Sequence, residues 1–155
     1  MYAKVGIKHR SINVSYITGR SMGSRSAVTV CCDKTMIDFV LGVICLSYPL
    51  HRPRVYTQLR DEPLYEIRKP ILFVSGTDDD MCKQELFLPV LDQLTSHDVH
   101  WIEGGNHGMD IKGKPIDDII QEISHVIITW IRKTLVIEPK RTKKQSSSQK
   151  KLKQT

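Results

Sequence analysis

A serine between two glycines, in the stretch "GRSMG" at residues 19–23, indicates chemistry more directly than any other feature of this sequence. The pattern G-x-S-x-G is typical of a nucleophile elbow, a sharp strand-to-helix turn that exposes the serine hydroxyl above a sheet. Gly19 and Gly23 would leave room for the tight turn and for close packing of the helix. The pattern alone is weak, because Ser21 could be a small residue in an ordinary tight turn. Its context strengthens it, since an apolar run precedes it and a helix-forming run follows.

Serine is a poor nucleophile at neutral pH, so it needs a general base, which an acid must orient. After such an elbow the chain order is serine, acid, histidine, with the acid after a later strand and the histidine after the last. Aspartates follow the apolar run at 70–75, and His107 lies in the Gly-rich stretch "EGGNHG". We therefore predict a catalytic triad of Ser21, Asp79 and His107 that acts on an ester or similar acyl bond.

Each of these assignments has an alternative. Asp78 is the second candidate for the acid, and we expect Asp80 to cap the helix that follows. The run of three aspartates could also be a polar turn, and a histidine in a loop is often only solvated. The other histidines have no comparable context and are expected to be structural or exposed: His9, His51, His97, His100 and His125.

Alternating strand and helix patterns must position these residues. The predicted order is strand 12–18, helix 22–32, strand 39–47, a polar excursion 51–69 with a short helix, strand 70–76, helix 83–94, strand 98–104 and helix 115–135. Pro89 is compatible with its helix only in the first turn or at a kink. This order predicts an α/β fold with about four parallel strands and helices on both faces. The carboxyl ends of parallel strands meet at one edge, where the three side chains would converge.

The charge distribution separates a folded domain at 1–136 from a tail at 137–155. The net charge of +6 comes entirely from residues 138–155, which hold seven basic residues and one acid, while the rest has 16 of each sign. The tail is low in apolar residues, so we expect it to be disordered. Nucleic-acid binding is therefore predicted only through the tail, which could also be a nuclear-localisation signal or a solvated segment.

The remaining composition bounds the environment. The longest apolar stretch, residues 39–46, is too short to span a bilayer, and no signal pattern is seen at the amino terminus. The cysteines have no CxxC spacing, so we predict four reduced thiols, no metal site and no cofactor: Cys31, Cys32, Cys45 and Cys82. We expect an intracellular protein, cytoplasmic or nuclear, without membrane contact.

Several stretches together resemble the α/β-hydrolase superfamily, on its dienelactone-hydrolase-like side. They are "GRSMGSRSA", "GVICLSYPLHRP", "LRDEPLYEIRKPILFVSGTDDDMC" and "HWIEGGNHGM", within about residues 11–135. More narrowly, they are similar to the group that includes testis-expressed protein 30 and the hydrolase-like domain of non-specific-lethal complex subunit 3. The resemblance implies Ser21 as nucleophile, Asp79 as acid and His107 as base. It also implies that the backbone amide of Met22 is an oxyanion donor.

The resemblance departs from the family at the front. About 20 residues precede Ser21, whereas a complete α/β-hydrolase has several strands there and a loop that supplies a second oxyanion amide. We therefore expect an amino-terminally shortened fold whose first strand has an open edge, available to a protein partner. The alternative to an enzyme acting on a small acyl substrate is a hydrolase-like scaffold without catalysis, near chromatin in the nucleus.

Overall fold

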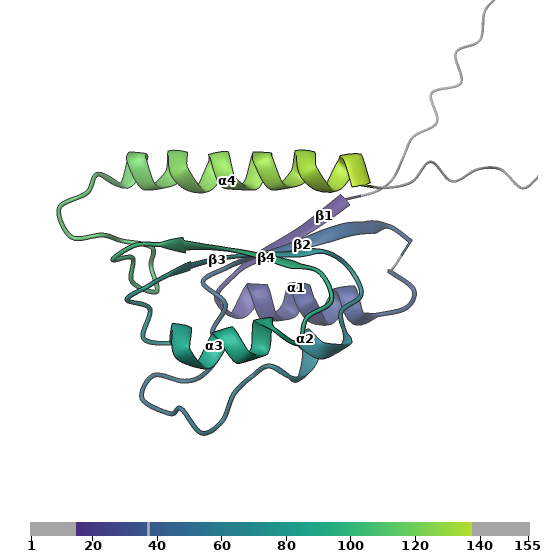
Figure 1. Cartoon of the computed structure of the whole chain (residues 1–155), viewed down its shortest axis with the longest axis horizontal. Coiled ribbons are helices and arrows are strands. Elements are labelled where there is room, and N and C mark those ends of the chain that lie inside the picture. The colour runs from purple at the N-terminus through teal and green to yellow at the C-terminus, as the bar shows by residue number, and fades with distance from the viewer. Residues whose placement is uncertain (1–14, 37, 138–155) are drawn as a thin grey trace, which may run out of the picture.

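A computed structural model describes residues 15–36 and 38–137, in which strands and helices alternate (Figure 1). The elements are β1 Ser15–Arg20, α1 Met22–Cys32, β2 Val40–Leu46, α2 Glu62–Glu66, β3 Ile71–Gly76, α3 Gln84–Leu91, β4 His97–Ile102 and α4 Ile116–Ile137. All eight correspond to predicted elements. The short helix in the polar excursion is α2.

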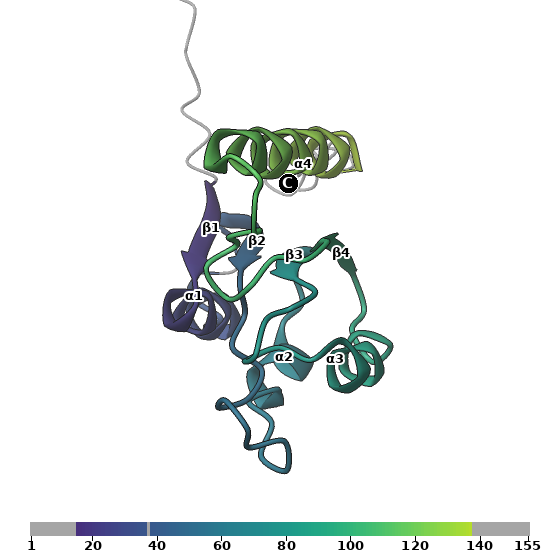
Figure 2. The same cartoon turned by 90° about the vertical axis from the view of Figure 1, so that its left-hand side faces the viewer.

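The four strands of this region form one sheet in the order β1-β2-β3-β4, and every neighbouring pair is parallel. Helix α4 covers one face of the sheet, and α1, α2 and α3 lie on the other (Figures 1 and 2). This confirms the predicted fold class. Because the strands are parallel, the loops that leave Arg20, Gly76 and Ile102 emerge at the same edge.

The central strands are apolar on both faces, as a sheet covered by helices on both sides requires. In β3, Ile71 and Phe73 pack in the core on the α1 side, while Leu72 and Val74 pack in the core under α4. All six residues of β3 are buried. The continuous apolar runs in the sequence therefore mark strands with no solvent-facing side.

Pro89 lies inside α3, which leaves a kink as the remaining prediction for this proline. One local expectation is wrong. Asp80 does not cap α3, because the residue before the helix is Lys83 and no side chain makes a cap hydrogen bond. In addition, β1 extends two residues beyond the predicted strand 12–18, because Gly19 and Arg20 pair with Cys45 and Leu46 of β2.

Several predictions concern segments at the ends of the chain. Helix α4 continues to Ile137, and the rest of the predicted basic tail lies outside the described residues, as do residues 12–14 of the first predicted strand.

All four cysteines are free, as predicted. Burial raises the pKa of the Cys31 thiol to about 11 and that of Cys82 to about 12. Within the described ranges no helix combines the length and apolar character needed to cross a bilayer.

We predict that Phe87→Ala lowers the free energy of unfolding by about 3–5 kcal/mol, because it leaves a cavity among aromatic rings. Phe87 is fully buried, with its ring 4.9 Å from that of Phe73 and 6.2 Å from that of Trp101. Leu88→Ala is the matched control, since Leu88 is 51 % exposed on the same helix. Urea unfolding of both variants measures the difference. Equal losses would contradict this packing.

Candidate active site

Ser21 lies at a strained turn between β1 and α1. Its backbone φ is +51° with ψ −123°, outside the regions that residues with a Cβ ordinarily adopt. The turn is held from below, because the Ser21 amide donates a 2.9 Å hydrogen bond to the Leu46 carbonyl at the end of β2. Such a turn raises the serine side chain above the carboxyl edge of the sheet, which is the geometry of a nucleophile elbow.

The two glycines of the motif have different roles. A Cβ on Gly19 would lie 2.2 Å from the carbonyl oxygen of Gly23, so β1 and α1 approach too closely for any side chain. A Cβ on Gly23 would meet nothing within 4 Å, and the φ of Gly23 is not positive. The expectation that both glycines make room is therefore correct for Gly19 and wrong for Gly23, whose backbone alone takes part in the contact.

The loops after β3 and β4 are joined by their backbones. A Cβ on Gly76 would lie 1.9 Å from the Gly105 carbonyl oxygen. The Asp78 amide donates to that carbonyl at 2.9 Å, and the Gly104 amide donates to the Thr77 hydroxyl at 2.8 Å. These contacts fix the aspartate loop against the histidine loop, so the two predicted side chains start from neighbouring backbones.

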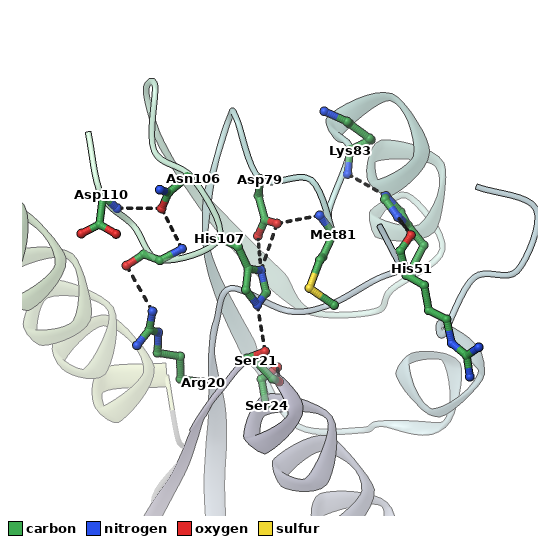
Figure 3. Close-up of polar contacts among 12 residues, drawn as sticks. Arg20, Ser21, Ser24, His51, Asp79, Met81, Lys83, Asn106, His107 and Asp110 are labelled. Carbon is green, nitrogen blue, oxygen red and sulfur yellow. Dashed lines mark hydrogen bonds and ion pairs between the residues drawn. The ribbon is translucent and has the colours of Figure 1, made fainter. Parts of the chain in front are cut away.

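Ser21, His107 and Asp79 form a continuous chain of hydrogen bonds (Figure 3). The Ser21 Oγ lies 2.8 Å from His107 Nε2. The other ring nitrogen, Nδ1, lies 3.0 and 2.9 Å from the two carboxylate oxygens of Asp79. Because an ionised carboxylate only accepts hydrogen bonds, Nδ1 donates to it, and Nε2 is left to accept from the serine hydroxyl.

Asp79, and not its neighbours, contacts the histidine. Its side chain is fully buried, and its Oδ1 also accepts a 2.7 Å hydrogen bond from the Met81 amide. Asp78 and Asp80 are exposed. In this structure the Asp78 side chain does not contact the His107 ring, so it does not orient it.

The amide of Met22 is available as a donor beside Ser21. Met22 is the first residue of α1, where backbone N–H groups have no intrahelical acceptor. No described residue accepts a hydrogen bond from it. A negatively charged oxygen formed next to Ser21 would find this amide, together with the positive end of the helix dipole.

Sequence reasoning did not identify His51 as part of this region. His51 is fully buried; its Nδ1 lies 2.9 Å from the Arg52 carbonyl, and its Nε2 accepts from the Lys83 amide at 3.2 Å. Its own amide donates to the Met81 carbonyl at 3.1 Å. His51 therefore links the excursion after β2 to the loop that holds Asp79 (Figure 3). The only signal in the sequence was its place in "SYPLHRP", which lacks any metal or acid-base spacing.

The opposite edge of the sheet has a cavity of about 430 Å³, lined among others by Pro70, His97 and Lys133. These residues lie at the amino ends of β3 and β4 and at the end of α4, far along the strands from Ser21. Its lining includes no member of the hydrogen-bonded chain. Over residues 15–36 and 38–137, no three His, Cys, Asp or Glu side chains gather as a metal site would require.

A sequence profile of the family described as alpha/beta hydrolase domain matches residues 2–132, most of the chain. The chain belongs to the α/β-hydrolase domain family. The finer resemblance stated above lies beyond what this match resolves.

Solved structures with the same fold are esterases and lipases among others. Est1E from Butyrivibrio proteoclasticus, solved with ferulic acid bound, has a TM-score of 0.59 at 14% identity over 78% of this chain and 59% of its own. A predicted CIB-like hydrolase from Thermoplasma acidophilum has a TM-score of 0.58 at 19% identity over 79% of this chain and 52% of its own. A monoacylglycerol lipase from Paleococcus ferrophilus has a TM-score of 0.60 at 15% identity over 79% of this chain and 69% of its own. The chain thus spans only about half to two thirds of these proteins.

We predict that Gly19→Ala lowers the free energy of unfolding by about 3 kcal/mol or more, because the new Cβ would overlap the Gly23 carbonyl. Gly23→Ala is the matched control and should be neutral or stabilising by about 0.5–1 kcal/mol, since alanine favours the helix. Chemical denaturation of the two variants measures both effects. A destabilising Gly23→Ala of the same size as Gly19→Ala would show that the elbow packs differently.

Proposed function

We propose that this protein is a serine hydrolase of ester or related acyl bonds, with Ser21 as nucleophile, His107 as general base and Asp79 as the orienting acid. One observation supports it above the others: the hydrogen-bonded chain from the Ser21 hydroxyl through both ring nitrogens of His107 to the buried Asp79 carboxylate. Ser21 and His107 are both partly exposed, whereas Asp79 is buried behind them.

In the proposed reaction, the Ser21 Oγ attacks the carbonyl carbon of the substrate while His107 Nε2 takes the hydroxyl proton. The tetrahedral intermediate collapses, the bond to the alcohol oxygen breaks, and His107 gives its proton to the departing alcohol. Water then attacks the acyl-serine with His107 again as base, which releases the carboxylic acid and restores Ser21. Asp79 holds the ring and stabilises its protonated form throughout.

The Met22 amide would stabilise the negative oxygen of the tetrahedral intermediate, at the amino end of α1. One such donor is typically worth about 100- to 1,000-fold in rate. In this fold the second donor comes from a loop ahead of the elbow strand, and residues 1–14 lie outside the described range. The proposal for the whole protein therefore depends on how that donor is supplied.

The proteins of the same fold support an acyl substrate in general terms. One was solved with ferulic acid bound, and another is a monoacylglycerol lipase. At 14% and 15% identity they share the fold with this chain, so they do not indicate which acyl or alcohol group it accepts.

A scaffold role without catalysis is the second candidate, and the position of β1 favours it. In the described sheet β1 pairs only with β2, so its other edge has unpaired backbone groups that a partner strand could fill. The narrower resemblance to testis-expressed protein 30 and to a chromatin-complex subunit fits such a role in the nucleus. The strained, fully connected Ser21 turn favours the enzyme, because a scaffold gains nothing from it.

We predict that a fluorescent fluorophosphonate labels the protein and that Ser21→Ala abolishes the labelling, because the label bonds to the activated Oγ. Ser26→Ala is the matched control: this exposed serine is on the same helix, and its hydroxyl contacts only the Met22 carbonyl at 3.3 Å. Labelling is measured by gel fluorescence, with circular dichroism to establish folding. A folded wild-type protein that is not labelled would contradict the hydrolase and favour the scaffold role.

We predict that Asp79→Asn slows fluorophosphonate labelling by roughly 10⁴-fold, since an amide at this position would favour the wrong histidine tautomer. Asp78→Asn should label at the wild-type rate, because its exposed side chain does not contact His107. Rates are compared under pseudo-first-order conditions. If Asp78→Asn were the slower of the two, the assignment of the acid would be wrong.

A further inference from the structure

Two arginine side chains, which form no ion pair with a carboxylate among the described residues, contact the side chain of Met22, the residue that follows Ser21. Arg25, one turn along α1 from Ser21, has its Nη1 3.9 Å from the Met22 sulfur. Arg60, which comes from the excursion after β2, has its Nη1 3.9 Å from the same sulfur. Two guanidinium groups from distant segments therefore meet around the residue that follows Ser21.

The Arg25 side chain interacts with the Tyr48 hydroxyl, but these guanidinium groups have further donors without a strong acceptor among the described residues. Each guanidinium has five N–H donors, and a thioether sulfur is a weak acceptor. The Nε of Arg25 is buried and has no hydrogen-bond partner among the described residues. A buried donor without an acceptor is costly, so this Nε is available to donate to a bound group.

The backbone holds Arg60 in place without using its charge. The Arg60 amide donates to the Leu50 carbonyl at 2.7 Å, and the Arg60 carbonyl accepts from the Tyr48 hydroxyl at 2.7 Å. Tyr48 is fully buried, so this anchor is rigid. The side chain of Arg60 is thereby directed to Met22 by an ordered backbone rather than by a flexible loop.

The local charge is positive and only weakly compensated. Partial burial lowers the pKa of Arg60, and the positive charges of Arg25 and Arg52 lower it further. The acid that follows directly, Asp61, accepts a 2.7 Å hydrogen bond from the Tyr65 hydroxyl instead. Across the described ranges, none of these arginines forms an ion pair with a carboxylate within 4 Å.

We propose that Arg25 and Arg60 bind an oxyanion group of the substrate, a carboxylate or a phosphate, beside Ser21. The planar guanidinium fork matches both groups and binds them more strongly than a neutral acceptor does. As a statement about the substrate, this rests on the proposed hydrolase function: the preferred ester would have a negative charge close to its scissile bond. As a statement about binding, it stands without catalysis.

The first experiment measures binding to the full chain with the Ser21→Ala substitution, so that no turnover interferes. Isothermal titration with succinate and with inorganic phosphate should give saturable binding of at least one, while the neutral succinamide should not bind. Arg25→Gln and Arg60→Gln should each weaken that binding by about 10-fold or more, the worth of a charged hydrogen bond. The anion that binds identifies which group is recognised.

Arg68→Gln is the matched control, since it removes one positive charge at an exposed position after α2 and should leave binding unchanged. Binding of neither anion, or equal weakening by Arg68→Gln, would overturn the proposal. Circular dichroism of each variant excludes loss of fold as the cause.

The second experiment uses the wild-type protein, in which Ser21 is intact. It compares the hydrolysis of mono-4-nitrophenyl succinate with that of 4-nitrophenyl acetate. The anionic ester should have the higher kcat/KM, and Arg25→Gln should reduce this value about 10-fold for the anionic ester while leaving the acetate unchanged. Equal losses on both esters would show a structural role and overturn the proposal. Anion binding without any hydrolysis or fluorophosphonate labelling would instead refute the hydrolase and leave the anion site standing.

Discussion

The backbone contact between Gly76 and Gly105 is the constraint on which the geometry of the site depends. Any Cβ at position 76 would overlap the Gly105 carbonyl, so the ends of β3 and β4 approach as closely as two chains can. The Asp78 amide and the Thr77 hydroxyl then bind the second loop directly. The separation between Asp79 and His107 is thus fixed by the backbone before either side chain is placed.

Ser21 is held at the same edge of the sheet through β2. The Ser21 amide donates a hydrogen bond to the end of β2, and β2 pairs with β3. The turn at Ser21 and the loop that holds Asp79 are therefore both attached to the same pair of strands. Arg20 adds a direct link, because its Nη2 donates to the Gly108 carbonyl at 3.2 Å (Figure 3). Three segments that are far apart in sequence are therefore held within hydrogen-bonding distance by short backbone contacts.

The order of strands and helices along the chain could be predicted from the sequence because apolar runs and glycine-ended turns are local signals. The pattern also found Ser21, Asp79 and His107, since each follows a recognisable strand. It could not choose between Gly19 and Gly23, because only the packing of α1 on β1 decides which glycine lacks space. It missed His51 and Arg60, whose side chains each contact a residue more than 20 residues away along the chain.

Unfavourable local features concentrate where the three loops meet. Among the described non-glycine residues, positive φ angles occur at Ser21, directly after β1, at Ser47, directly after β2, and at Met109, in the loop after β4, with Arg54 in the excursion as the exception. Among the described residues, the buried side-chain nitrogen and oxygen atoms without partners are Arg25 Nε, Ser47 Oγ and Ser75 Oγ, all near the carboxyl ends of strands β1 to β3. Strain and unsatisfied donors persist only where the surrounding structure enforces them, and they cluster at sites that bind or react. The lining of the cavity at the amino edge includes none of these residues, so these features lie on the side of the sheet where Ser21, His107 and Asp79 are hydrogen-bonded.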